Sequence, residues 1–293
     1  MIVSTLYKAG NTLGESPFWN DRRRSVFWVD IEKGILHELN WDTKEAKIWE
    51  LNTRVSLILE ERDGLMTLAV QGGLIRFDLQ TGSVEWLAEI EKDMENIRCN
   101  DGAIDNKGRI WVGVMDVQCT AGLGSLYRLD SVSDRPVKML EGLTIPNGLV
   151  WSRNGDRMYF IDTVSRCVKS FLFNLANGSI EYEKDAVTIP ASLGMPDGMT
   201  IDEEGMLWIA LYGGFSVGCW NPINGKLMDL IKLPVPKITN CCFAGDNLDQ
   251  LVVTSANENL SPEELAKYPE SGNLFVIQHP GAKGVRAYAP ALL

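Results

Sequence analysis

The chain has 293 residues, of which 45% are hydrophobic, and its formal net charge at pH 7 is −11. This length accommodates two domains or one large all-β or α/β-barrel domain, and a chain of this size buries enough apolar surface to fold without disulfide or metal staples. The acidic balance argues against nucleic acid and anionic membrane as partners, because both require a cationic surface.

The N-terminal segment and the cysteines predict a cytoplasmic protein. Residues 1–14 lack the cationic start and the long apolar core of a signal peptide, and no run approaches the length of a membrane span. The six cysteines form no C-x-x-C pair, which favours reduced thiols. We expect a monomer or a weak homo-oligomer without membrane or nucleic-acid partners.

The scarcity of histidine limits the possible chemistry. The chain has two histidines, His37 and His279, and they lie far apart in the sequence. It contains neither a G-x-S-x-G nor an H-E-x-x-H motif. A Ser-His-Asp triad, a histidine-rich zinc site or a haem site would each depend on one of these two residues. Any metal would therefore have to be held by oxygen atoms.

Six short polar segments recur along the chain and define a repeat. In chain order the segments are "GESPFW", "RVSLIL", "CNDGAI", "IPNGLV", "MPDGMT" and "ITNCCF". Each has one anchor residue at the equivalent position, and these anchors are Glu15, Ser56, Asp101, Asn147, Asp197 and Asn240. The steps between these anchor residues are 41, 45, 46, 50 and 43 residues, or 45 on average. A period of about 40–50 residues is typical of a β-propeller.

Each anchor is followed by predicted β-strands. First come β-rich segments at residues 25–30, 64–70, 108–114, 156–162, 205–211 and 249–255. Second β-rich segments follow at 34–39, 73–79, 124–130, 167–173, 215–220 and 272–277. Short strands with turn signals every 8–12 residues indicate an all-β fold, and four strands in each of six repeats make a six-bladed β-propeller. The alternative is a pair of β-sandwiches. We expect one domain spanning residues 1–293.

One segment is predicted to be helical. In "LSPEELAKYP", residues 260–269, Ser261 can cap the helix, Pro262 fits the first turn and Glu264 completes a capping box. We expect a short helix inserted in the last blade.

The anchors predict a cation site. The innermost strands of a propeller line its central channel, so equivalent positions fall on one ring, and carbonyl and carboxylate oxygens suit Ca²⁺, Mg²⁺ or Mn²⁺. The alternative for each Asn-Gly or Asp-Gly is ordinary turn chemistry or a buried hydrogen-bond cap. For Asp101 we expect such a cap, with Asn100 facing the channel instead. Arg98 would face the same way, either to hold a substrate oxygen or to neutralise Asp101.

Taken together, these motifs resemble the gluconolactonase/regucalcin family, also called senescence marker protein-30-like. The resemblance covers essentially the whole chain and rests on "LGESPFW", "IRCNDGAIDNKGRIWVGVM", "GSLYRLD", "IPNGLVWSRNGDRMYFIDT", "MPDGMTIDEEGMLWIALYGG" and "LSPEELAKYPESGNLFVI". The chain looks most like the bacterial sugar-lactone hydrolases of that family.

The resemblance implies a six-bladed propeller with one divalent cation on Glu15, Asn147 and Asp197, and with Arg98 and Asn100 near the substrate. The identity of the cation stays open among Ca²⁺, Mn²⁺, Mg²⁺, Zn²⁺ and Fe²⁺. The segment "GVMDVQCTAG" departs from the family in a loop expected to set sugar preference. It carries Asp116 and Gln118, and we place Gln118 among the substrate-binding residues.

The expected activity is hydrolysis of a sugar lactone such as glucono-, xylono-, arabinono- or galactonolactone. A divalent ion polarises a carbonyl and lowers the pKa of water, and Asp197 is the candidate general base, so no histidine is required. The alternatives are a calcium-binding propeller without activity and a hydrolase of other esters or phosphotriesters. A scaffold for protein partners ranks last, because it needs no ring of oxygen atoms.

Overall fold

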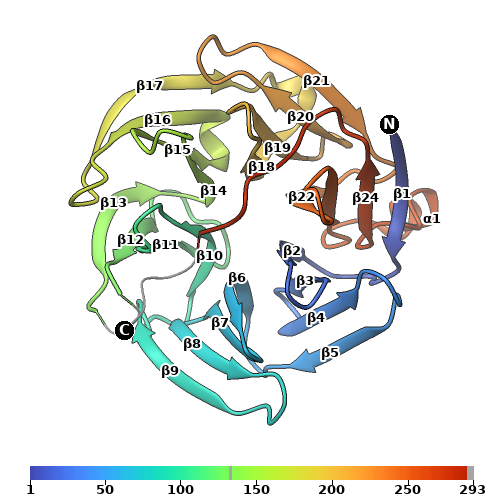
Figure 1. The fold of residues 1–293 in the computed structure, drawn as a ribbon, viewed down its shortest axis with the longest axis horizontal. Coiled ribbons are helices and arrows are strands. Elements are labelled where there is room, and N and C mark those ends of the chain that lie inside the picture. Colours follow the sequence, from blue (N-terminus) through green and yellow to red (C-terminus); the bar gives the residue numbers. More distant parts are fainter. Residues whose placement is uncertain (132–133, 289–293) are drawn as a thin grey trace.

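The computed structural model describes residues 1–131 and 134–288 and forms a six-bladed β-propeller, as the repeat predicted. Six four-stranded antiparallel sheets surround a central axis (Figure 1). Each blade begins with an inner strand beside the axis and ends with an exposed outer strand, so the six anchors fall at equivalent places around the channel.

Blades one to three follow the chain in order. The first contains β2 (Gly14–Asn20), β3 (Ser25–Asp30), β4 (Ile35–Asn40) and β5 (Ala46–Glu50). The second contains β6 (Val55–Arg62), β7 (Leu65–Val70), β8 (Gly73–Asp78) and β9 (Val84–Glu89). The third contains β10 (Ile97–Ile104), β11 (Ile110–Asp116), β12 (Gly124–Leu129) and β13 (Val137–Leu143).

Blades four to six complete the ring. The fourth contains β14 (Pro146–Trp151), β15 (Arg157–Asp162), β16 (Cys167–Phe173) and β17 (Ile180–Thr188). The fifth contains β18 (Met195–Ile201), β19 (Leu207–Tyr212), β20 (Ser216–Trp220) and β21 (Leu227–Lys232). The sixth contains β22 (Ile238–Ala244), β23 (Gln250–Ser255), β24 (Leu274–Gln278) and the N-terminal strand β1 (Ile2–Tyr7). Two short 3₁₀ helices occupy Thr163–Ser165 and Ala191–Leu193.

The N-terminal strand closes the ring. β1 pairs antiparallel with β24, so the sixth sheet takes its outer strand from the opposite end of the chain (Figure 1). This pairing covers the free edge of β24 with residues from the first repeat, and closed propellers leave only short, protected edges. The repeat in the sequence did not predict that β1 joins the sixth blade.

The β-rich segments form the blade interiors because each sheet packs against a neighbour on both faces. Every residue of β3 is buried, whereas β5, the outermost strand of the same blade, is mostly exposed. Between the fifth and sixth blades, for example, the rings of Trp208 and Phe243 meet edge to face at 5.8 Å. Burial on both faces explains why the second strands read as continuous apolar runs rather than as alternating patterns.

The anchors lie at β-bulges. In all six inner strands the register with the second strand shifts at the anchor, for example between Glu15 and Phe18 and between Pro196 and Met199. A bulge leaves residues unpaired and redirects their side chains. The Asn-Gly and Asp-Gly pairs therefore stand inside strands, and the turn interpretation is wrong for them.

The glycines after Asn147 and Asp197 are needed for space rather than for a turn. A Cβ added to Gly198 would lie 2.0 Å from Asn240 Cγ, and one added to Gly148 would lie 2.6 Å from Met199 Cβ. In each case the contacted atom belongs to the next inner strand around the ring. The missing side chain thus lets adjacent inner strands approach closely.

The predicted helix is confirmed as α1 (Pro262–Lys267), between β23 and β24. Ser261 accepts from the Glu264 amide and Glu264 accepts from the Ser261 amide, which is a complete capping box. No helix within residues 1–131 and 134–288 is long and apolar enough to span a membrane. All six cysteines lie in the described part of the chain, and none is in a disulfide.

Candidate metal and substrate site

Glu15, Asn147 and Asp197 converge on the channel from three blades. Each lies at the beginning of an inner strand, and each is buried, with 4–7% of its surface exposed. Asn147 Nδ2 donates a hydrogen bond of 2.5 Å to Asp197 Oδ1, which joins the fourth and fifth blades across the channel wall. The ring predicted from the repeat is therefore present in the fold.

The Asn147 amide is oriented so that its oxygen is left free. Its nitrogen donates both to Asp197 and, at 3.0 Å, to Thr163 Oγ1. A carboxylate can only accept, so this pair fixes which amide atom is nitrogen. Asn147 Oδ1 is buried and finds no hydrogen-bond partner in the described protein. A buried acceptor without a protein partner is costly, so this oxygen is available to a ligand.

Glu15 is supported from one side only. Its Oε2 accepts hydrogen bonds from the Ser16 amide and from Asn240 Nδ2, both at 2.9 Å. Both bonds reach the same oxygen, so Oε1 stays available. Two carboxylates and one amide oxygen form a hard donor set of the kind preferred by divalent cations such as Ca²⁺, Mg²⁺ and Mn²⁺.

The donor set combines two carboxylates with one neutral amide oxygen and is not a cluster of acidic side chains alone. Within the described residues, no group of three or more His, Cys, Asp or Glu side chains is arranged to hold a metal ion. The Glu15, Asn147 and Asp197 set falls outside that description because its third oxygen comes from an amide. Neutral amide oxygens nevertheless serve as ligands of hard cations.

Burial perturbs the acidic groups of the ring. It raises the pKa of Glu15 to about 8, with the nearby charge of Asp101 adding to the effect. Burial also raises the pKa of Asp101 to about 6. The pKa of Asp197 is raised well above its usual range, first by burial and then by the charges of Glu15 and Asp101. Like charges crowded in a dry channel repel, and a bound cation would relieve that repulsion.

Asp101 has two roles in the structure. The Gly102 amide donates to its Oδ1 at 2.7 Å, so the expected local cap is present. Its other oxygen faces Asn240 Nδ2 at 3.5 Å, although Asn240 belongs to the sixth blade, opposite the third. The carboxylate of Asp101 therefore also reaches toward the channel axis.

Arg98 and Asn100 form a connected pair. Arg98 Nη1 donates to Asn100 Oδ1 at 2.6 Å, and Asn100 Nδ2 donates to the Pro146 carbonyl at 2.8 Å. Arg98 Nη1 also donates to the Cys99 carbonyl, and within the described residues no hydrogen bond or ion pair joins Arg98 to Asp101, so its remaining donors are not spent on neutralising that carboxylate. Fixed in this way, the guanidinium can donate to a bound molecule.

The loop after β11 places Gln118 and Asp116 differently. Asp116 is buried and its carboxylate accepts from Asn96 Nδ2 at 3.0 Å and from the Thr120 amide at 3.1 Å. Asp116 therefore stabilises the loop. Gln118 is exposed on that loop, at the end of the channel where Arg98 lies, since Asp116 pairs with Ile97.

The histidines take no part in the ring. His37 stacks on Trp28 inside the first blade with ring centroids 4.6 Å apart, and burial lowers its pKa to about 4. His279 follows β24, beyond the opposite end of the sixth blade. An oxygen-only site is thus what the chain can offer in the channel.

The far end of the channel is covered by the C-terminal segment. In Figure 1 the dark red chain after β24 crosses the middle of the ring. The Gly284 amide donates to the Leu248 carbonyl, and the Lys283 carbonyl accepts from the Glu203 amide, both at 2.8 Å. These contacts lie beyond the C-terminal ends of β18 and β22, whereas the anchors lie near the beginnings. A cavity of 460 Å³ lies beneath this segment, and Asp101 and Asn240 are among the residues that line it. We refer to the opposite end of the channel, where Gln118 is exposed, as the open end.

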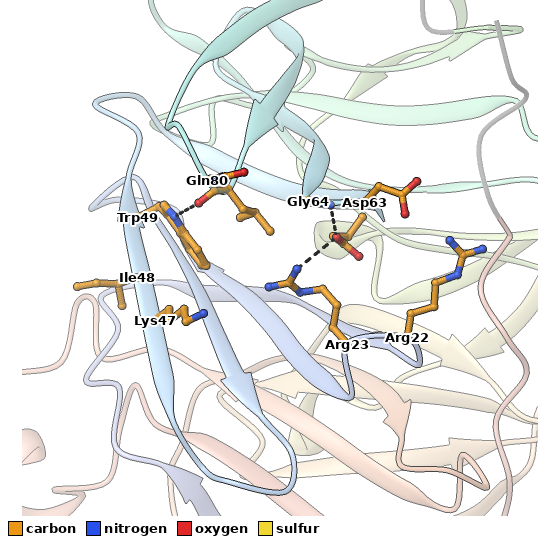
Figure 2. Close-up of a pocket in the computed structure, with 10 residues that line it drawn as sticks. Arg22, Arg23, Lys47, Ile48, Trp49, Asp63, Gly64 and Gln80 are labelled. Carbon is orange, nitrogen blue, oxygen red and sulfur yellow. Dashed lines mark hydrogen bonds and ion pairs between the residues drawn. The ribbon is translucent and has the colours of Figure 1, made fainter.

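A groove between the first two blades is unrelated to the ring (Figure 2). It encloses 770 Å³ and is lined by charged residues of the blade surfaces, including Arg23, Glu61 and Asp63. Trp49 Nε1 donates to the Leu79 carbonyl, and Glu61 accepts from the Gly64 amide and pairs with Arg23 at 3.7 Å. The polar groups of Trp49, Glu61 and Arg23 therefore find partners within the protein. None of the anchors lines the groove.

Sequence reasoning missed three features of the channel. Thr163, which orients Asn147, directly follows the β-rich segment of the fourth repeat. Asn240 bridges Glu15 and Asp101, which no periodicity could show. A group at the open end is formed by Tyr212, Lys237 and Glu258, and the sequence pattern did not single out any of these residues.

Comparison with known proteins agrees with this geometry. Residues 13–257 match the family model described as the SMP-30/Gluconolactonase/LRE-like region. The chain belongs to this family. Regucalcin of Macaca fascicularis is 34% identical over 286 residues, covering 95% of this chain and 94% of the relative. A Bacillus subtilis protein named "Putative sugar lactone lactonase YvrE" is 30% identical over 266 residues, covering 91% of each chain.

A solved structure extends the family assignment to the fold. The calcium-binding protein regucalcin from Agrobacterium tumefaciens superposes with a TM-score of 0.93 at 26% identity, covering 98% of this chain and 97% of the other. The recognition of the family from its motifs and the six-bladed architecture are both confirmed.

Proposed function

We propose that this member of the gluconolactonase-like family is a divalent-metal-dependent hydrolase of sugar lactones, such as the lactones of gluconic, xylonic, arabinonic or galactonic acid. The observation that carries the proposal is the free Asn147 Oδ1, buried beside Glu15 and Asp197 in the central channel. The family membership and the lactonase name of one relative support it.

Glu15, Asn147 and Asp197 would hold the cation, which when bound supplies a Lewis acid for the lactone carbonyl and lowers the pKa of water. Asp197 carries the acid–base role: it accepts the proton of the attacking water and returns it to the ring oxygen as that bond breaks. Its hydrogen bond from Asn147 keeps one oxygen fixed while the other accepts the proton.

Arg98, Asn100 and Gln118 would position the substrate. Arg98 is held by its bond to Asn100, and its free N–H groups can donate to the carbonyl oxygen or to ring hydroxyls. Asn100 is held in turn by the Pro146 carbonyl. Gln118, exposed at the open end, can contact hydroxyls farther from the reacting carbonyl.

The test is a pH-indicator assay of lactone opening. Chelator-treated protein receives glucono-, galactono-, xylono- or arabinonolactone, with Ca²⁺, Mn²⁺, Mg²⁺, Zn²⁺ or Fe²⁺ added back singly. We expect opening faster than in buffer with at least one ion, and Asp197→Asn to lower kcat/KM by about 10²–10⁴-fold. Asp229→Asn, on the exposed outer strand β21, is the matched control.

Two outcomes overturn the proposal. If no lactone opens faster than in buffer with any ion, while an ion still raises the melting temperature, the protein is a cation-binding propeller like its calcium-binding relative. If opening needs no metal, the role of the oxygen ring fails even though the activity stands.

A further inference from the structure

Three polar side chains form a wall at the open end of the channel: Tyr212 from the end of β19, Lys237 just before β22, and Glu258 after β23. Their backbones are joined to one another and to the ring. Tyr212 pairs with Met195, two residues before Asp197, and forms a bridge with Lys237. The Glu258 amide donates to the Thr12 carbonyl at 3.0 Å, three residues before Glu15.

The side chains of this wall are locked together. The Tyr212 hydroxyl donates to Glu258 Oε1 at 3.1 Å, and Lys237 Nζ donates to the Glu258 carbonyl at 2.5 Å. Lys237 Nζ also stands 5.2 Å from the centre of the Tyr212 ring. These contacts leave Glu258 Oε2, two protons of the ammonium and the lone pairs of the phenol oxygen for other partners.

The wall faces the same space as the predicted site residues. Asp197 is influenced by the charge of Glu258, after larger effects of burial, Glu15 and Asp101. The Arg98 guanidinium, whose pKa is lowered by burial, is stabilised in its charged form by the carboxylates of Glu32, Glu258 and Glu15. Arg98 and Glu258 thus stand on opposite blades, the third and the sixth, around one opening.

We propose that Tyr212, Lys237 and Glu258 are specificity residues that bind the hydroxyl groups of the substrate away from its reacting carbonyl. This inference rests on the proposed lactonase function and assigns the recognition of the sugar hydroxyls to these three side chains. Adjacent hydroxyls of a sugar donate to a carboxylate and accept from an ammonium, and the wall presents one of each beside an aromatic ring.

Polar groups that are fixed and partly buried discriminate between lactones with and without hydroxyl groups more strongly than solvated polar groups do. A site built to hydrogen-bond hydroxyls rejects analogues that lack them, because its own polar groups are then left unpaired. The locked contacts within the wall pre-organise it, so little ordering is needed when the sugar binds. A lactone without hydroxyls would therefore reach the same ring but bind poorly.

Binding of the sugar hydroxyls can be measured separately from hydrolysis by calorimetric titration of Mn²⁺-loaded protein with 1,5-anhydroglucitol. This compound carries the ring hydroxyls of a six-carbon sugar but has no carbonyl. We expect Tyr212→Phe to weaken binding about 3–10-fold and Glu258→Ala about 10–100-fold, as for neutral and charged hydrogen bonds. Tyr182→Phe is the matched control, because the Tyr182 hydroxyl donates to Asp185 at 3.1 Å on the exposed face of the fourth blade.

Steady-state kinetics provide a second test of whether the wall recognises the hydroxyls of the substrate. The ratio of kcat/KM for glucono-1,5-lactone to that for δ-valerolactone, which has no hydroxyls, is expected to fall about ten-fold in Glu258→Ala through a higher KM for the sugar lactone. Melting temperatures identify variants that fail to fold, and Lys237→Met tests the wall independently of Glu258.

The outcomes separate this inference from the proposed function. Wild-type protein that opens glucono-1,5-lactone, combined with folded wall variants that keep wild-type affinity and preference, overturns the inference alone. Wild-type protein that opens none of the sugar lactones with any cation overturns the proposed function, and loss of anhydroglucitol binding in Glu258→Ala would then still support hydroxyl recognition by the wall.

Discussion

Asn240 donates a 2.9 Å hydrogen bond from Nδ2 to Glu15 Oε2 and so joins the last blade of the propeller to the first inside the channel. The same nitrogen faces Asp101 at 3.5 Å on the opposite side of the ring. One amide therefore supports two carboxylates whose pKa values are raised by burial, with the charge of Asp101 adding to the effect at Glu15. The position that the repeat assigned as a sixth possible ligand acts in the structure as a donor.

Replacement of Asn240 by Ala is expected to weaken cation binding. Loss of the donor leaves the buried Glu15 carboxylate with a single supporting amide, and hydrogen bonds to charged groups contribute about 1.5–3 kcal/mol, so we expect about 10–100-fold lower affinity. Calorimetric titration with Mn²⁺ measures this change. Asn224→Ala, in an exposed turn where the side chain accepts from the Lys226 amide, is the control. Unchanged affinity in Asn240→Ala would contradict the supporting role.

Gly198→Ala tests the close approach of the inner strands. The added methyl would overlap the Asn240 amide, so we expect the free energy of unfolding to fall by about 1–3 kcal/mol and lactone opening to be lost as Asn240 is displaced. Gly82→Ala is the comparison: its φ of 72° makes Ala costly by about 1–2 kcal/mol, but its surroundings are open and far from the channel.

Chemical denaturation and activity assays together distinguish these variants. Both are expected to be destabilised, but only Gly198→Ala should lose activity. Full activity in Gly198→Ala would show that Asn240 can move without disturbing the ring.

The metal-free protein is expected to become more stable as the pH falls from 8 to 6. The folded-state pKa values of Glu15 and Asp101 are raised to about 8 and about 6, so in this window the folded chain binds more protons than the unfolded chain. The free energy of unfolding therefore decreases as pH rises toward 8. Melting temperatures in the presence of a chelator check the direction.

Glu15→Gln provides the control for this pH dependence. It removes the acid whose pKa is raised to about 8, so the metal-free variant should melt higher than wild type at pH 8 and show a flatter pH profile. Saturating cation should also flatten the wild-type profile, since cation binding requires deprotonated carboxylates. A wild-type melting temperature that rises from pH 6 to pH 8 in chelator would disprove the assignment of these shifts.

The sequence by itself determined the repeat and hence the fold. Period, anchors and apolar segments agree because each blade must bury both faces of its middle strands and return the chain to the axis every 45 residues. The short helix was equally legible, since Ser261 and Glu264 form a local capping box. Glu15, Asn147 and Asp197 were placed on one ring because equivalent positions in a propeller share it, whereas their selection among the six anchors as metal ligands rests on the family resemblance.

Only the tertiary structure decided what each ring residue does. That Asn147 presents its oxygen, that Asn240 donates rather than coordinates, and that Asp101 both caps its strand and faces the axis depend on contacts between residues from different blades. The exchange of β1 into the sixth blade and the wall of Tyr212, Lys237 and Glu258 likewise join distant segments. Such contacts leave no periodic trace, because they are set by closure of the ring and not by local propensity.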